Sequence, residues 1–504
     1  MNNNSNARIA KNTILLYMRM FVTLLVSLYT SRVLLKSLGV DDYGIYNIIG
    51  GVVVLFSFLS NAMTNSTQRF LNYNVGLNDE KEIKKVFCVG MQAHFVIAVI
   101  ILVLAETVGL WFVATQLNIP QERMYAAHWV YQFSVLTTCI NIMRVPYNAV
   151  VVAYEKMSFF AYVSIAETAL KLFVVYMILL GNNADRLILY SVLLTIVSFF
   201  VWGIYRCYCR REYSISRYAN LRSNKLFKEM MSFTSWYLFG GVAMVGSRQG
   251  VNILLNIFFN VAVNAAVGIA NQVKGAIYGF VTSFQTAFKP QIVKLYANNE
   301  TETLSKLINR ATKFSFLLMF LLAFPIVLCC ENILSVWLVE VPQYAVVFTQ
   351  LTIIASLFDA ISAPLWTVIG ATGKVKYYQI LVSLILLTDI PLSYFALKSG
   401  YSPTSVFFVN VVVNLMAYIF RLMYANRIIK LHIFSYLKEA IIPCINVCVC
   451  TLPLLIYLVF SYELQWIYTV VISVFTSLIS IYLLALEPTE RDFMRSLIIK
   501  RIYR

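Results

Sequence analysis

The sequence predicts an all-α polytopic membrane protein, and three observations support this fold class. Apolar residues make up 60% of the 504 residues, and charged residues only 12%. Soluble domains carry about 25% charged residues. Long apolar runs recur along the chain, and a hydrocarbon core about 30 Å thick requires roughly 20 such residues per helix. The connections between the runs are too short for a sizeable soluble domain.

Apolar runs separated by polar breaks predict fourteen membrane-spanning helices. They cover approximately residues 12–35, 44–66, 86–113, 125–153, 159–181, 186–206, 233–258, 261–287, 313–339, 344–369, 378–397, 404–425, 440–460 and 466–486. An even number of spans places both termini on the same side of the membrane. The start, MNNNSNARIAKN, lacks the apolar core and cleavage site of a signal peptide, so the first span is expected to act as the insertion signal.

The distribution of basic residues predicts the orientation. The net charge of +17 would suggest nucleic acid in a soluble chain, but here most basic residues lie in loops. Thirty of the 40 Lys and Arg residues fall in the connections on the side that holds the termini, and five fall on the opposite side. The positive-inside rule therefore predicts that both termini are cytoplasmic. We expect no nucleic-acid partner, and we expect the basic inner loops to contact anionic lipid headgroups.

A weak internal repeat predicts two pseudo-symmetric six-helix lobes. TQRFLNY at residues 67–73 corresponds to PQIVKLY at residues 290–296, and a second match of Pro146 with Pro364 follows in the same order. Six-helix repeats keep the same orientation, a plan known among transporters. The predicted domains are an N-lobe at 1–207, a cytoplasmic basic linker at 208–232, a C-lobe at 233–430, and two further helices with a cytoplasmic tail at 431–504.

Ten ionisable residues lie inside the predicted spans, and such residues normally face a bundle interior or a wet cavity. The cations are Arg19, Arg144, Lys171, Arg248 and Lys274, and the acids are Glu106, Glu167, Glu331, Asp359 and Asp389. Glu167 and Lys171 are four residues apart in the order that favours a pair on one helix. This pair is interpreted as a structural ion pair or as part of an ion-coupling site.

Three of the cations are candidates for binding an anionic substrate. Arg19, Arg248 and Lys274 lie near the middle of spans one, seven and eight, and Asn271 and Gln272 stand beside Lys274. Arginine can hold phosphate oxygens in a bidentate manner, and lysine supplies a compact charge. Two interpretations remain open for the mid-membrane acids Asp359 and Asp389. They are counter-ions of these cations, or one of them binds a coupling proton or sodium ion.

Two stretches of the N-terminal half resemble the polysaccharide-type flippases of the multidrug/oligosaccharidyl-lipid/polysaccharide exporter superfamily. One is the run NTILLYMRMFVTLLVSLYTSRVLLKSLGVDDYGIYNIIGGVVVLFSFL, in which the turn from Gly39 to Tyr46 is the most specific part. The other is RVPYNAVVVAYEKMSFFAYVSI after the fourth span. The resemblance implies a MATE-like fold over essentially the whole chain.

The resemblance also implies a function and partners. Such proteins flip undecaprenyl-diphosphate-linked oligosaccharides, such as O-antigen or other polysaccharide repeat units, from the inner to the outer leaflet of the bacterial inner membrane. The implied role is in lipopolysaccharide or polysaccharide biosynthesis, with a polymerase and glycosyltransferases as candidate protein partners. No cofactor is expected apart from a coupling proton or sodium ion.

Two other functions remain as alternatives. The same superfamily includes cation-coupled multidrug antiporters, but a cationic drug favours an acidic cavity, and Arg248 and Lys274 argue against one. A membrane enzyme, such as a polysaccharide polymerase or acyltransferase, is the other alternative. We expect no enzyme, because no large outer loop and no nucleophile–base spacing or metal motif is present.

Overall fold

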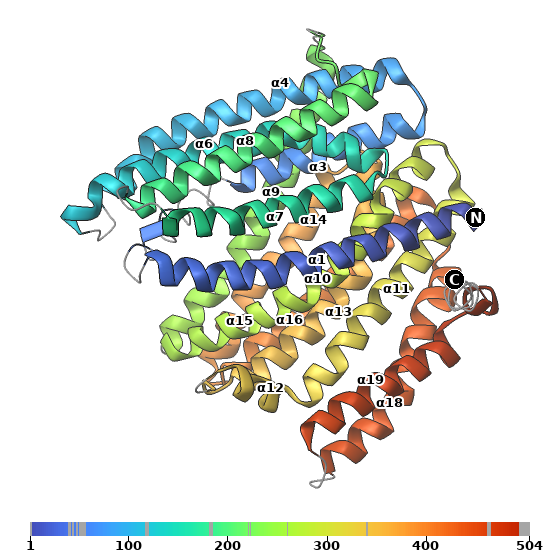
Figure 1. The fold of residues 1–504 in the computed structure, drawn as a ribbon. Helices are drawn as coiled ribbons and strands as arrows, with labels where there is room; N and C mark the ends of the chain where they lie inside the picture. Colours follow the sequence, from blue (N-terminus) through green and yellow to red (C-terminus); the bar gives the residue numbers. More distant parts are fainter. Residues whose placement is uncertain are drawn as a thin grey trace, which may run out of the picture. The chain divides into compact units, whose positions relative to one another are not determined.

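The computed structural model describes a helical protein without strands in its described part (Figure 1). The described backbone comprises residues 3–38, 42, 45–46, 49, 57–115, 120–180, 185–219, 221, 223–259, 261–338, 341–460 and 465–492. The predicted span 44–66 is described only at residues 45–46, 49 and 57–66, and most of the turn from Gly39 to Tyr46 lies outside the described residues. The contacts divide the chain into two compact units, one of Met1–Gly241 with Val293–Asn299 and one of Val242–Ile292 with Glu300–Arg504.

The first unit is built from long helices that follow the predicted apolar runs. Its elements are α1 (Asn3–Leu38), α3 (Ser57–Gly76), α4 (Glu80–Leu104), η1 (Ala105–Gly109), α5 (Leu110–Thr115), α6 (Gln121–Ala153), α7 (Met157–Leu180), α8 (Arg186–Glu212), η2 (Ser214–Ser216) and the first part of α9 (Asn224–Phe258). Helix α1 packs along α7, and α6 packs along α8. The helices α8 and α9 thus extend into both ends of the predicted linker at 208–232.

The second unit contains the rest of α9 and the C-terminal helices. Its elements are α10 (Val261–Ala297, up to Ile292), α11 (Thr301–Leu328), α12 (Cys330–Trp337), α13 (Ala345–Ala371), α14 (Lys376–Leu387), α15 (Asp389–Lys398), α16 (Thr404–Ile429), α17 (Ile433–Tyr436), η3 (Leu437–Ile441), α18 (Ile442–Phe460), α19 (Trp466–Ser480) and η4 (Ile481–Ala485). Helix α13 packs against α11 and α16, and α19 packs against α11.

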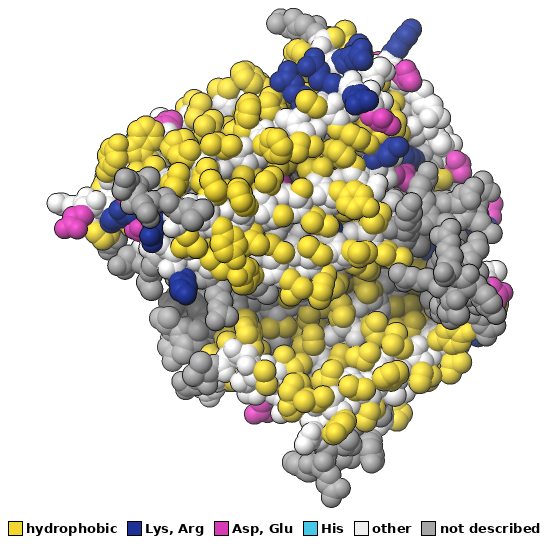
Figure 2. All heavy atoms as spheres, in the orientation of Figure 1, with side chains coloured by type: hydrophobic (Ala, Val, Ile, Leu, Met, Phe, Trp, Pro, Cys, Tyr) yellow, Lys and Arg dark blue, Asp and Glu magenta, His cyan; other side chains and the backbone are white. Residues whose placement is uncertain are grey.

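The chain is a multi-pass membrane protein, but fourteen spans are not confirmed. Within the described residues, ten helices are long and apolar enough to cross a membrane, and each coincides with one predicted span. Three further helices, α1, α9 and α10, have 36, 35 and 37 residues. Many hydrophobic side chains on the long helices are exposed, as expected for surfaces that face lipid (Figure 2).

Short polar connections set how neighbouring helices of the first unit meet. Glu155, in the turn between α6 and α7, has a positive φ of 58° and accepts a bond from Lys294 Nζ at 2.7 Å. Nearby, a Cβ added at Gly76 of α3 would lie 2.8 Å from the backbone Cα of Lys294. A side chain at Gly76 would therefore push these two backbone segments apart. Lys294 belongs to PQIVKLY, one of the two segments of the internal repeat.

Candidate functional site

The predicted ion pair of Glu167 and Lys171 on α7 is present in the structure. A third residue, Arg144, also binds Glu167, and sequence spacing did not predict this contact. Lys171 Nζ donates to Glu167 Oε1 at 2.7 Å, and Arg144 Nη1 of α6 donates to Glu167 Oε2 at 2.8 Å. Arg144 is 23 residues away from Glu167 in the sequence. Nothing in a single sequence connects two residues that far apart, so the three-membered ion cluster follows only from the packing of α6 beside α7.

Arg19 lies on α1 where this helix packs against α7. Its guanidinium carbon is 4.7 Å from the centroid of the Phe160 ring, and its Nε is buried without a hydrogen-bond partner. Among the described residues Arg19 makes no ion pair. Tyr205 of α8 interacts electrostatically with both Arg19 and Arg144. Among the described residues, Glu167 therefore has two cationic partners, Arg144 and Lys171, and that cluster carries a net positive charge.

Lys274 of α10 forms an ion pair inside the second unit. Its Nζ lies 3.2 Å from Asp359 Oδ2 of α13, and the side chains are 20% and 25% exposed. Asp359 is therefore the counter-ion of Lys274, one of the two alternatives that the sequence left open for this acid. The pair still reaches solvent or lipid on one side, so Lys274 retains donors for a second anion.

The other predicted substrate-binding residues are Arg248 on α9 and the amides Asn271 and Gln272 on α10. Ser247 Oγ of α9 donates to the carbonyl of Leu386 at 2.9 Å, and Gly250 packs closely on Ile390. That face of α9 is therefore occupied by α14 and α15, while Arg248 is exposed. Within the described part of the chain Arg248 makes no hydrogen bond or ion pair. On α10, Asn271 is half-buried and Gln272 is exposed.

Asp389 lies apart from these cations. It is buried at the start of α15, where it accepts bonds from Asn410 Nδ2 at 2.8 Å and Ser393 Oγ at 3.4 Å. It contacts neither Arg248 nor Lys274 in the described structure, so the observed pairing favours the counter-ion interpretation for Asp359 but not for Asp389. A buried carboxyl held by an amide and a hydroxyl suits the role of a proton-binding or sodium-binding group, and that role stays a prediction.

A second ion cluster ties together helix ends in the first unit. Arg123, at the start of α6, donates to Asp42 Oδ1 at 2.8 Å and to Asp185 Oδ2 at 2.6 Å. Asp185 also caps α8 by accepting from the backbone N–H of Leu187 at 3.0 Å. Burial alone would raise the pKa of Asp185, but the bonds from Arg123 and the helix backbone lower it below the usual value of 3.8.

Acidification is expected to weaken this cluster. The lowered pKa means that the carboxylate of Asp185 stabilises the folded state above about pH 4, and this contribution is lost as the pH falls through the folded-state pKa. Because the cluster is partly exposed, the loss is under about 1 kcal/mol. Thermal unfolding in detergent should show a fall in stability below about pH 4 that is smaller in the Arg123→Gln variant. An equal fall in that variant would contradict the assignment.

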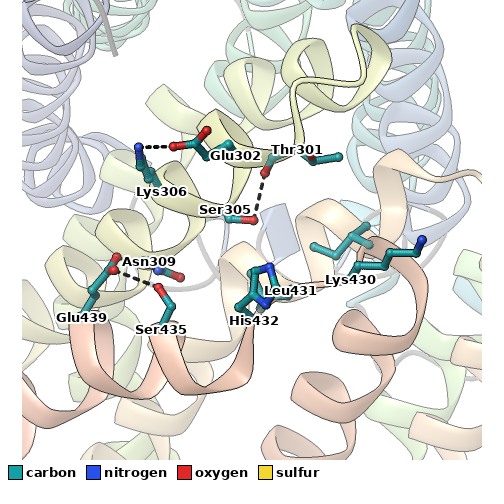
Figure 3. Close-up of a pocket in the computed structure, with 11 residues that line it drawn as sticks. Thr301, Glu302, Ser305, Lys306, Asn309, Lys430, Leu431, His432, Ser435 and Glu439 are labelled. Carbon is teal, nitrogen blue, oxygen red and sulfur yellow. Dashed lines mark hydrogen bonds and ion pairs between the residues drawn. The ribbon is translucent and has the colours of Figure 1, made fainter.

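A polar pocket of the second unit contains residues that sequence reasoning did not single out. It has a volume of about 350 Å³ and lies between the start of α11 and the segment from Lys430 to Glu439 (Figure 3). Lys306 is paired with Glu302, and Glu439 accepts a bond from Ser435 at 2.8 Å. Since Lys306 is neutralised by Glu302 and the carboxylate of Glu439 also lines the pocket, we consider the pocket a weaker candidate for an anionic substrate than the exposed Arg248.

The comparisons with known proteins agree with this architecture. Residues 231–395 match the model of the MatE family. The solved structures show the same fold over most of the chain, although at low identity. A MATE protein in the straight conformation superposes with a TM-score of 0.72 and 11% identity, covering 84% of this chain and 96% of that one.

Two other solved structures have the same fold and cover the same fractions of the two chains. An outward-facing multidrug resistance MATE family transporter of the MOP superfamily gives a TM-score of 0.71 at 13% identity, covering 84% of this chain and 96% of that one. A MOP superfamily transporter from Pyrococcus furiosus gives 0.69 at 12%, with the same coverage. No curated protein matches the chain in sequence. These superpositions confirm the expected MATE-like fold.

Proposed function

We propose that this protein is a flippase that carries undecaprenyl-diphosphate-linked oligosaccharide from the inner to the outer leaflet of the bacterial inner membrane. The observation that supports this proposal is that each unit holds an arginine, inside a predicted span, that has no carboxylate partner among the described residues. These are Arg19 in the first unit and Arg248 in the second. A charge at that depth costs at least about 2.5 kcal/mol on insertion scales, so it requires a function or a partner.

The chemistry of these sites fits a diphosphate. Arg19 has an unbonded Nε, Arg248 is exposed, and a guanidinium can hold two phosphate oxygens at once. Lys274 adds a compact charge beside Asn271 and Gln272, whose amides suit sugar hydroxyls. In the proposed mechanism the diphosphate and sugar cross by alternating access through a cationic interior, while the polyprenyl chain stays in lipid. Both termini are cytoplasmic in this proposal.

The mid-span carboxylates argue against the alternative of a multidrug antiporter. Glu106 accepts a bond from Gln132 at 3.1 Å, Glu167 binds two cations, and Asp359 binds Lys274. A cationic drug would therefore have to displace an internal partner. The Pyrococcus furiosus transporter is described as having a binding pocket of reverse polarity, which suggests a different function for that protein. A change of pocket charge within this fold supports our assignment of an anionic substrate.

The sidedness of lipid-linked oligosaccharide in cells depleted of this protein tests the proposal. We expect the intermediate to accumulate on the cytoplasmic leaflet, and wild-type protein but not Arg248→Ala to restore its export. A charge-assisted bond contributes about 1.5–3 kcal/mol, so the variant should bind substrate at least about tenfold more weakly. Arg211→Ala, an exposed arginine at the end of α8, is the matched control. Correct sidedness with increased retention of cationic dyes would instead indicate the drug antiporter.

A further inference from the structure

The first unit carries a surface groove that runs between α4, α6 and α8 and that the proposed transport site does not use. Two cavities form it, one of about 300 Å³ and one of about 660 Å³, and they share Phe95, Met143 and Trp202. The smaller cavity is lined by apolar residues and by Trp202, and the larger one opens toward the loop that precedes α9. The groove therefore has an apolar end and a polar end.

The length of the groove matches one leaflet of a bilayer. On α4 its lining extends from Met91 to Leu102, which is about 16 Å along a helix. Half of a hydrocarbon core about 30 Å thick is about 15 Å. The apolar side chains here are largely exposed, with Val99 at 43% and Phe199 at 58%. The groove is thus long enough to hold one acyl chain from headgroup level to the membrane centre.

The polar end of the groove is cationic. Arg206 of α8 lines it and stacks on Trp202, with 5.1 Å between the guanidinium carbon and the ring centroid. Among the described residues Arg206 contacts no carboxylate, and none of the described residues that line either cavity is Asp or Glu. The ring N–H of Trp202 is buried without a hydrogen-bond partner. Because that N–H is buried, Arg206 is the group at this end that can meet an anion in the groove.

The remaining polar residues position the loop over this end. Gln92 Nε2 of α4 donates to Tyr218 Oη and to the carbonyl of Leu221, both at 3.3 Å. These bonds hold the loop beside Arg206, where Ser223 and Asn224 complete the lining. Figure 2, viewed as Figure 1, shows basic side chains gathered where α4 begins and α8 ends, next to a hydrophobic surface along the same helices.

We propose that this groove binds an anionic glycerophospholipid, with its phosphate on Arg206 and one acyl chain along Val99 and Phe199. The positive charge of the residues that line the groove favours an anionic lipid over a zwitterionic one. An anionic headgroup finds a cation and donors, whereas the ammonium group of a zwitterionic lipid finds no carboxylate among the described lining residues. The bound lipid is a membrane component, not the transported substrate, since the groove contains none of Arg19, Arg248 and Lys274.

Native mass spectrometry of the full-length protein in detergent, with equal amounts of phosphatidylglycerol and phosphatidylcholine, tests this proposal. We expect the wild type to retain phosphatidylglycerol preferentially, and Arg206→Ala to retain about fivefold less, the factor that corresponds to one cation near a membrane surface. Arg211→Ala, on the same helix but outside the groove, should behave as wild type. Equal retention of both lipids by the wild type would overturn the proposal.

A second variant separates the acyl chain from the headgroup. Val99→Trp fills the apolar end at an exposed position and should lower the binding of phosphatidylglycerol without touching Arg206. Unchanged phosphatidylglycerol binding in Val99→Trp would also overturn the proposal. Thermal unfolding of each variant controls for folding. Because the assay measures no transport, its outcome is independent of the flippase proposal.

Discussion

Replacing Lys274 by alanine is expected to abolish export of the lipid-linked oligosaccharide while the protein remains in the membrane. The change removes a cation proposed to contact the diphosphate and leaves Asp359, 25% exposed, without its partner at 3.2 Å. An unpaired acid at this depth costs about 3 kcal/mol on insertion scales, so thermal stability should fall as well. Lys274→Arg keeps the charge and should retain part of the export. Lys398→Ala, an exposed lysine at the end of α15, is the matched control.

The double variant Lys274→Ala, Asp359→Ala separates the two roles of this pair. Removing both charges should restore most of the thermal stability lost in the single variant, because no unpaired charge remains. Export should nevertheless stay absent if Lys274 binds substrate. A double variant that regains both stability and export would show that the pair is only structural. That result would withdraw Lys274 from the proposed site while leaving Arg19 and Arg248 to be tested.

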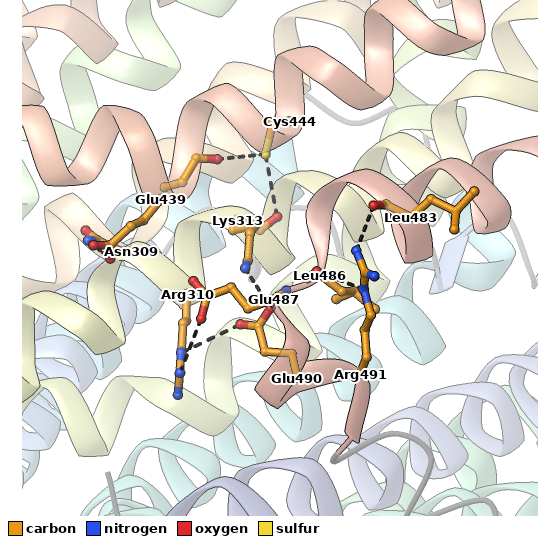
Figure 4. A network of polar contacts seen from close by, with 11 residues as sticks. Asn309, Arg310, Lys313, Glu439, Cys444, Leu483, Leu486, Glu487, Glu490 and Arg491 are labelled. Carbon is orange, nitrogen blue, oxygen red and sulfur yellow. Dashed lines mark hydrogen bonds and ion pairs between the residues drawn. The ribbon is translucent and has the colours of Figure 1, made fainter.

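Replacing Lys313 by alanine is expected to lower the stability of the protein more than replacing Lys274 does. Lys313 of α11 is 1% exposed, and its Nζ lies 2.7 Å from Glu490 Oε2, in the segment that follows η4 (Figure 4). Removing one partner of a buried pair costs about 3–5 kcal/mol. Arg310, with its Nε 3.6 Å from Glu490 Oε1, offers only a longer contact in compensation. The thermal unfolding temperature in detergent should fall clearly.

A control on the same helix makes this prediction specific. Lys306 pairs with Glu302, but their side chains are 57% and 84% exposed, so Lys306→Ala should cost under about 1 kcal/mol. Replacing both buried partners, as Lys313→Met with Glu490→Leu, should recover most of the stability. Equal losses in Lys306→Ala and Lys313→Ala would contradict the assignment of a buried ion pair.

Much of the fold could be predicted from the sequence, because the bilayer imposes a local rule. A spanning helix must satisfy its own backbone and present about 20 apolar residues, so length and composition alone located the ten long apolar helices of the described residues. The ion pair of Glu167 and Lys171 could also be predicted, because residues four positions apart lie on the same face of one helix. Helix ends were less well determined, as α8 and α9 show by extending into the predicted linker.

The partners of the membrane-embedded charges were decided by tertiary structure. The sequence by itself predicted that Arg19, Arg248, Lys274, Asp359 and Asp389 lie within apolar spans, because that prediction depends on neighbours along the chain. It could not determine that Arg144 joins Glu167, that Asp359 rather than Asp389 accepts from Lys274, or that Arg206 stands at the end of a groove. Those relations depend on which faces of separate helices meet, and a side chain's energy in the membrane is set by that contact rather than by its place in the sequence.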